Sequence, residues 1–187
     1  MGKYLESFSK SILAGGAITI GAIIYCALGG GVAAAILFSV GLYLVLWFGL
    51  NLYTGKVGYA TSLKDIPNLL IIFLGNTVGC LLAFSVLPTP FAVSLVTAKL
   101  AIPLYITLIK AIICGILIYA GVEQYKQKRE YAPLVIVPSF ILVGAEHSIA
   151  DIGYLILARC FTWEAVLFIL IVAIGNAIGS LLWKNLT

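Results

Sequence analysis

Four long stretches without a charged side chain constrain this chain more than any other feature. They cover residues 11–55, 66–98, 132–145 and 165–183. A helix needs about 20 mostly apolar residues to cross a bilayer. The chain has 187 residues, 63% of them hydrophobic and only 10% charged, so little remains for a soluble domain. The sequence therefore predicts an all-α membrane protein, a single domain over residues 1–187 with six transmembrane helices.

The basic residues predict the orientation. With a cytoplasmic amino terminus, the inner segments carry Lys3, Lys10, Lys56, Lys64, Lys126, Lys128, Arg129 and Lys184. The outer segments carry only Lys99 and Arg159. Because cytoplasmic loops are enriched in Lys and Arg, both termini are expected in the cytoplasm, with the protein in the plasma membrane. The first apolar run follows a polar start without a cleavage site, which indicates a retained span.

The composition also argues against other classes of protein. The net charge of +4 is spread over loops, so it indicates no nucleic-acid partner. The four cysteines lie far apart without a CxxC pair, so we expect neither a metal site nor a disulfide framework, and no cofactor. No GxSxG or HExxH motif is present, so an enzyme is not expected.

Two pairs of segments recur at one offset of 100 residues. "KSILAGGAI" and "KAIICGILI" share Lys10 and Gly15 with Lys110 and Gly115. "LGNTVGCLL" recurs as "IGNAIGSLL", and the shared positions are Gly75, Asn76, Gly79, Gly175, Asn176 and Gly179. Three spans in each half predict a 3+3 inverted repeat, with halves of about 8–90 and 99–187. Small residues at this spacing also let helices approach closely.

The middle span of each half is interrupted. "FGLNLYTGKVGYA" (48–60) places Thr54 and glycines where a helix should continue, and "VGAEHSIAD" (143–151) does so in the other half. Ser148 and Asp151 have the spacing of a helix start. The second and fifth helices are therefore predicted to be broken. Irregular backbone at membrane depth must be buried in protein or line a cavity, and a helix amino terminus there favours an anion.

Polar side chains at these breaks predict a central site. Placing an ionisable group at the centre of a span costs about 2.5–3.5 kcal/mol of insertion free energy. Glu146 and His147 are therefore expected to have a structural or functional role. They form either a structural pair that holds the break or a proton-handling site, since histidine titrates near neutral pH. Thr54 either caps a helix or donates its hydroxyl to an anion. Lys110, within a span, snorkels or pairs with a buried acid such as Glu146, and Lys99 in an outer loop either attracts anions or is solvated.

The segments "NLYTG", "LGNTVG", "GAEHSIAD" and "IGNAIGS" resemble the signatures of the formate/nitrite transporter family. The resemblance implies a homopentameric channel for small monovalent anions, with an aquaporin-like protomer. It assigns His147 to the central histidine and Thr54 to the pore-facing threonine. It assigns the apolar constrictions to Phe38, Leu42, Leu52, Tyr53, Val122 and Phe140.

Several residues depart from the family's pattern. Tyr119 stands where an asparagine is usual, Asp151 replaces another asparagine, and Lys110 stands where an acid is common. The family's vestibule lysine lies about one turn closer to the glycine of the fourth span than Lys99 does. The segment before the first span is too short to form the amphipathic helix that usually precedes this span in the family.

A weak acid suits such a pore, because a bare anion in an apolar neck loses its hydration and a neutral acid does not. His147 would supply or stabilise the proton, and Thr54 would orient the anion. The expected partners are protons, the lipid bilayer and a small anion, with formate or nitrite favoured and hydrosulfide, acetate or lactate open. Two other functions are compatible with the sequence. The chain could be the substrate-binding six-span subunit of a vitamin importer, or an aquaporin-type channel, although the paired Asn-Pro-Ala motifs of aquaporins are missing.

Overall fold

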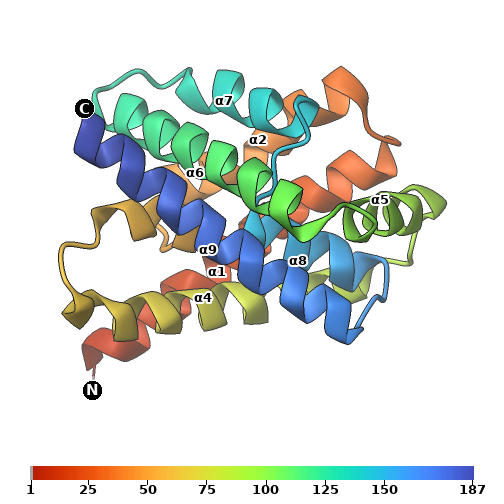
Figure 1. The fold of residues 1–187 in the computed structure, drawn as a ribbon, viewed down its shortest axis with the longest axis horizontal. Coiled ribbons are helices and arrows are strands. Elements are labelled where there is room, and N and C mark those ends of the chain that lie inside the picture. Colours follow the sequence, from red (N-terminus) through yellow and green to blue (C-terminus); the bar gives the residue numbers. More distant parts are fainter. Residues whose placement is uncertain (1) are drawn as a thin grey trace.

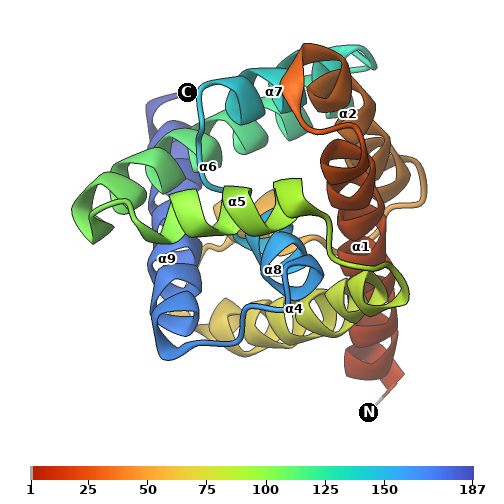
Figure 2. The same cartoon turned by 90° about the vertical axis from the view of Figure 1, so that its right-hand side faces the viewer.

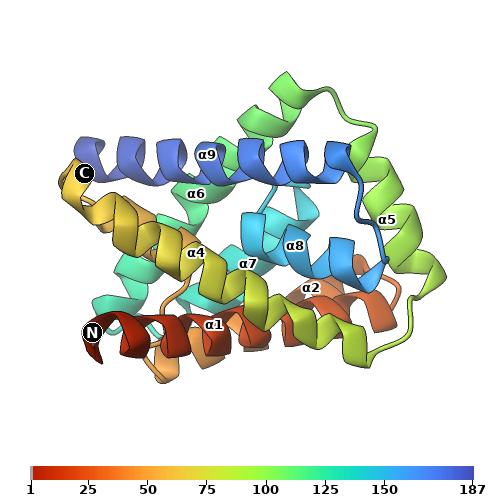
Figure 3. The ribbon, with the colours of Figure 1, turned by 90° about the horizontal axis from the view of Figure 1, so that it is seen from below.

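The computed structural model describes residues 2–187, in which every regular element is a helix. The α-helices are α1 (Gly2–Ala27), α2 (Gly31–Trp47), α3 (Tyr53–Lys56), α4 (Ile66–Cys80), α5 (Pro90–Leu100), α6 (Leu104–Lys126), α7 (Ala132–Leu142), α8 (Ser148–Leu157) and α9 (Trp163–Leu186). Both termini lie at one end of the molecule, and α5 lies at the other end (Figures 1 and 3). We call these the terminal end and the α5 end.

Four helices are long and apolar enough to cross a membrane. They cover Tyr4–Ala27, Leu63–Ser85, Leu104–Lys126 and Trp163–Leu186. Four more apolar helices, α2, α5, α7 and α8, have between 10 and 17 residues. The described chain therefore has more helices than the six predicted spans, and several of these helices are shorter than a full span. One of them was missed from the sequence, since Lys99 lies on helix α5 and not in a loop.

Helix α8 forms the centre of the molecule. All of its residues, from Ser148 to Leu157, are buried. Figure 2 shows α8 surrounded by α1, α4 and α9, with α5 crossing in front of it. The outward faces of the surrounding helices carry exposed leucine, isoleucine and valine side chains. Such a surface suits lipid or a second apolar protein face, not water.

Glycines set the closest helix contacts at equivalent places in the two halves. A Cβ atom on Gly79 of α4 would overlap the carbonyl oxygen of Ile12 in α1, and one on Gly179 of α9 would overlap that of Ile112 in α6. Side chains larger than hydrogen would therefore force these backbones apart. The pairs α1–α4 and α6–α9 pack in the same manner because of these residues.

Replacing Gly79 by alanine should destabilise the protein by about 1–3 kcal/mol, the usual range for overpacking a tight contact. Gly16→Ala is the matched control, because its Cβ would meet no atom closer than 3.8 Å. The measurement is thermal unfolding in detergent. Equal melting temperatures for the two variants would show that the α1–α4 contact tolerates a methyl group and would contradict the argument.

The chain is interrupted at both places that the sequence indicated. Helix α2 ends at Trp47 and α7 ends at Leu142. Gly49 (φ 58°) and Gly144 (φ 68°) follow these ends in the left-handed conformation that favours glycine. Beyond them the backbone N–H of Leu50 donates to Val45 and that of Ala145 to Phe140, at 2.9 Å each. Both helices therefore stop with the same hydrogen-bonded turn, which releases the chain toward the centre.

Candidate functional site

Asn76 of α4 holds the first interruption in place. Its Oδ1 accepts the backbone N–H of Tyr53 at 2.8 Å, which fixes the start of α3. Its Nδ2 donates to the carbonyl oxygens of Ser11 (2.7 Å) and Asn51 (2.8 Å). The side chain is fully buried. One amide thus satisfies backbone groups that the missing helical turn leaves open.

Asn176 of α9 does the same for the second interruption. Its Oδ1 accepts the backbone N–H of Ser148 at 2.9 Å, the first residue of α8. Its Nδ2 donates to the carbonyl oxygens of Ala111 (2.9 Å) and Glu146 (2.8 Å). Asn76 and Asn176 therefore hold the two breaks in equivalent ways. Because Thr54 and His147 belong to these breaks, the two side chains lie at the same depth in the molecule.

Thr54 and His147 meet at the centre. The Oγ1 atom of Thr54 lies 2.8 Å from Nε2 of His147, and both side chains are buried. The Nδ1 atom of His147 accepts the backbone N–H of Ala150 at 3.1 Å and so caps α8. An accepting Nδ1 carries no proton, so in the neutral ring the proton sits on Nε2 and is donated to Thr54. The hydroxyl hydrogen of Thr54 is then free for another acceptor.

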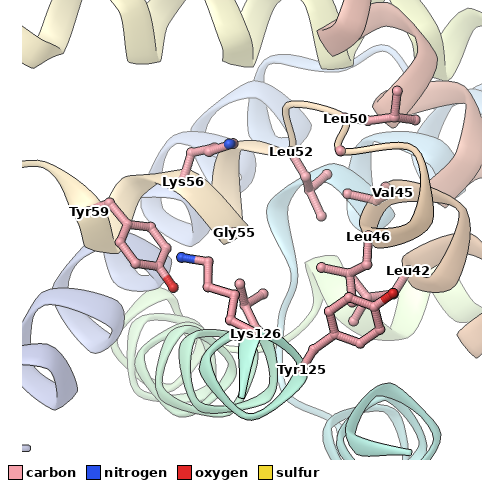
Figure 4. A pocket seen from close by; sticks show the side chains of 12 residues that line it. Leu42, Val45, Leu46, Leu50, Leu52, Gly55, Lys56, Tyr59, Tyr125 and Lys126 are labelled. Atoms are coloured by element: carbon pink, nitrogen blue, oxygen red, sulfur yellow. The ribbon is translucent and has the colours of Figure 1, made fainter. Parts of the chain in front are cut away.

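A cavity of about 290 Å³ opens at the terminal end. Leu42, Leu52 and Val122, three of the predicted constriction residues, lie among its walls. Figure 4 shows Leu52 extending into the hollow and the side chains of Lys56 and Lys126 on its other side. The wall is thus apolar toward the centre and basic at the mouth.

Lys56 and Lys126 are not among the site residues predicted from the sequence. The ammonium group of Lys126 lies 3.5 Å from the ring centroid of Tyr59 and 3.3 Å from a carboxylate oxygen of Glu123. The sequence signal for Lys56 was its position two residues after Thr54. Lys126 is the last residue of α6, and only the fold brings it to this mouth.

A second cavity of about 210 Å³ opens at the α5 end. The charged and aromatic residues that line it include Lys99, Lys110, Phe140, Glu146, His147, Asp151 and Tyr154. The ring of Phe140 stacks on His147, with centroids 5.6 Å apart. The cavity therefore reaches the central histidine from the side opposite Lys56 and Lys126.

Phe38 belongs to the same aromatic cluster. Its ring lies edge-on to Phe140 at 6.3 Å and tilted against Tyr154 at 6.4 Å. Tyr53 lies elsewhere: its hydroxyl donates to the carbonyl of Ala173 at 3.1 Å, and it lines neither cavity. Of the predicted constriction residues, Phe38 and Phe140 therefore gather near His147 on the α5 side, while Tyr53 packs outside the cavity walls.

Lys99, not Lys110, is the ion-pair partner of Glu146. The ammonium of Lys99 contacts Glu146 Oε2 and also lies 2.9 Å from Asp151 Oδ1. Lys110 lines the same cavity but forms no ion pair within residues 2–187. The pairing of Lys110 with Glu146 considered from the sequence is thus wrong, and Lys99 is largely buried instead of solvated.

Tyr119, where the family usually has asparagine, does not reach the histidine. Its ring packs against Tyr59, with centroids 5.3 Å apart, and a Cβ on Gly58 would overlap it. The hydrogen bonds of His147 go to Thr54 and Ala150 instead. Within the described chain, no group of three His, Cys, Asp or Glu side chains is placed to hold a metal ion.

Comparison with known proteins identifies the family. The family model described as "Formate/nitrite transporter" matches residues 2–186. The chain belongs to the formate/nitrite transporter family. It is therefore a multi-pass membrane protein of a transporter family, which displaces the vitamin-importer and aquaporin readings. A search of curated proteins finds no significant match.

Two solved structures share the fold of this formate/nitrite transporter family member. A "Pentameric formate channel with formate bound" is 18% identical, with a TM-score of 0.85, and the match covers 99% of this chain and 96% of that one. An "FNT family ion channel" is 22% identical, with a TM-score of 0.85, over 97% of this chain and 88% of that one. At these identities the likeness establishes the fold and leaves the pore residues to be argued from this chain.

Proposed function

We propose that this protein is a pH-dependent channel or transporter for small monovalent anions of weak acids, with formate or nitrite favoured. The observation that carries the proposal is the Thr54–His147 pair, which lies where the two helix breaks meet, between two separate cavities. The pair presents a free hydroxyl hydrogen between apolar walls. Hydrosulfide, acetate and lactate remain candidate substrates by the same chemistry.

The proposed topology has six spans in one domain, residues 1–187. Helices α2–α3 and α7–α8 each make one interrupted span, and α1, α4, α6 and α9 make the others. The equivalent contacts of Asn76 and Asn176 support a 3+3 inverted repeat over about 8–90 and 99–187. Basic residues favour the terminal end as the cytoplasmic one, in the plasma membrane. The pentamer named for the formate channel, together with the exposed apolar faces, supports a homopentamer.

The proposed path runs through the site in three stages. The basic mouth at Lys56 and Lys126, or the cavity at Lys110, draws an anion from water by its positive charge. At the centre the hydroxyl of Thr54 donates to the anion, while the neutral ring of His147 orients that hydroxyl. The apolar walls at Leu52 and Phe140 favour passage as the neutral acid, because a bare anion would lose several kcal/mol of hydration there. The anion takes the proton for this step from water in the cavity that it enters and releases it to water in the other cavity.

His147 acts in this scheme by stabilising the donor, not by holding a second proton. Protonation of Nδ1 would remove the acceptor of the Ala150 N–H and uncap α8. His147→Asn is expected to lower the flux at every pH, because asparagine can cap the helix but is too short to orient Thr54. A variant with the full wild-type flux would remove the histidine from the mechanism.

The experiment that tests the proposal is anion flux into proteoliposomes. Formate, nitrite and hydrosulfide are compared at several pH values, with protein-free vesicles as the control for passive leak. We expect fast flux of at least one anion above the leak, rising as the pH falls. The absence of flux for all small anions, with a reconstituted and folded protein, would overturn the proposed function.

A further inference from the structure

The buried charges of the α5-end cavity leave little for an anion to bind. The ammonium of Lys99 contacts Glu146 Oε2 and lies 2.9 Å from Asp151 Oδ1, and all three side chains are largely buried. Two carboxyl groups therefore surround the one ammonium group. Lys110 lines the cavity from a half-exposed position beside Gly144 and attracts an anion by its charge. Hydrogen bonds that replace the water of an anion deeper in the cavity have to come from other side chains.

Tyr154 of α8 supplies a hydrogen-bond donor in this cavity. Its side chain lines the cavity and is 5% exposed. Tyr53, for comparison, donates its hydroxyl to the carbonyl of Ala173. The Tyr154 hydroxyl makes no hydrogen bond within residues 2–187, and it is not among the fully enclosed polar atoms that lack a partner. The phenol O–H group is therefore open to the cavity and available to donate to a guest.

Packing holds the ring of Tyr154 beside the aromatic constriction. The ring is tilted against Phe38, with centroids 6.4 Å apart, and against Tyr25 of α1, with centroids 6.1 Å apart. Phe38 in turn meets Phe140, whose ring stacks on His147. Tyr154 thus lies between the partly exposed Tyr25 and the apolar cluster next to the central histidine. A ring held on two sides presents its hydroxyl at little cost in conformational entropy.

We propose that the hydroxyl of Tyr154 is the anion-binding donor of the α5-end cavity, and that it replaces part of the hydration shell before the anion meets Phe38 and Phe140. The proposal rests on the proposed function and adds a site ahead of Thr54. The acceptor is an oxygen atom of the anion, as in formate or nitrite, and no proton is transferred. A neutral donor suits this position, because conduction needs binding strong enough for entry and weak enough for release.

Tyr154→Phe isolates the hydroxyl, because phenylalanine keeps the ring and its packing. With the α5 end facing the added nitrite, the half-saturating concentration for influx should rise about 3- to 10-fold, the range for one hydrogen bond that water partly replaces. The maximal rate should not fall, because the constriction beyond the site is unchanged. The rise should be equal at about pH 6 and about pH 8, because a phenol ordinarily ionises at about pH 10.

Tyr105→Phe is the matched control, because Tyr105 of α6 is 68% exposed and lines neither cavity. Its half-saturating concentration should equal that of the wild type. The melting temperature in detergent separates binding from a structural role: Tyr154→Phe should melt with the wild type, since the hydroxyl has no partner in the described chain. A lowered melting temperature would overturn the proposal. An unchanged half-saturating concentration, or a rise confined to one pH, would do the same.

Infrared difference spectroscopy tests the contact without transport. Nitrite added to the solubilised protein should shift a tyrosine C–O band in the wild type and in Tyr105→Phe, but not in Tyr154→Phe. If the wild type shows the shift but carries no anion, the proposed function fails while the Tyr154 site stands. If the shift is missing from the wild type, or persists in Tyr154→Phe, the site fails whatever the flux.

Discussion

Thr54→Val should reduce anion flux by about 10- to 100-fold at every pH, the factor expected for one hydrogen bond to a charged group worth about 1.5–3 kcal/mol. Valine has the shape of threonine and lacks only the hydroxyl. Thr54 is fully buried between the two cavities, so no water replaces the lost donor. The anion would then cross the centre beside Leu52 and Phe140 with nothing to compensate its lost hydration. Initial rates of formate and nitrite influx into proteoliposomes provide the measurement.

Two controls separate transport from stability in this variant. Thr54→Ser keeps the hydroxyl and should retain most of the flux. Valine also leaves Nε2–H of His147 without its acceptor, which should lower the melting temperature modestly in detergent. A folded Thr54→Val protein with wild-type flux would show that the hydroxyl does not face the permeating anion. Equal losses in the serine and valine variants would assign Thr54 a packing role.

The glycines and polar residues that interrupt two apolar runs were sufficient to predict where the fold breaks. The glycines near residues 49 and 144, with the polar residues beside them, indicated two interrupted helices that carry Thr54 and His147. The repeated Gly-Asn pairs indicated two equivalent halves. These signals are local: a glycine in the left-handed conformation ends a helix wherever it occurs. The number of helices was harder to predict. Helix α5 has only 11 residues and follows a Pro-rich turn, so its sequence is typical of a loop.

The electrostatics of the site could not be read from the sequence, because they depend on contacts between distant segments. Lys99 and Glu146 are 47 residues apart, and nothing local distinguishes that pair from Lys110 with Glu146. Only the position of α5 across the end of α8 decides it. Similarly, the tautomer of His147 depends on a hydrogen bond that the sequence does not show. The backbone N–H of Ala150, in the first turn of α8, donates to Nδ1 of His147. The residue types were predictable, but their partners required the fold.

The buried amide of Asn176 should be costly to remove. It makes three buried hydrogen bonds, to the backbone of Ser148, Ala111 and Glu146. Hydrogen bonds within membrane proteins contribute about 0.6 kcal/mol on average and up to about 1.7, so Asn176→Ala should destabilise by about 2–5 kcal/mol. The start of α8 would lose its anchor, and flux should fall with it because His147 shifts from Thr54.

Asn76→Ala offers an internal comparison, because Asn76 makes the equivalent three bonds at the other break. It should cost a similar free energy of unfolding, while the exposed Asn68→Ala should cost little. Thermal unfolding in detergent measures the three variants side by side. Asn176→Asp refines the test, since a carboxylate keeps the acceptor for Ser148 but loses both donors. If Asn176→Ala unfolds at the same temperature as Asn68→Ala, the buried amides do not hold the breaks, and the positions of Thr54 and His147 must come from apolar packing around α8 alone.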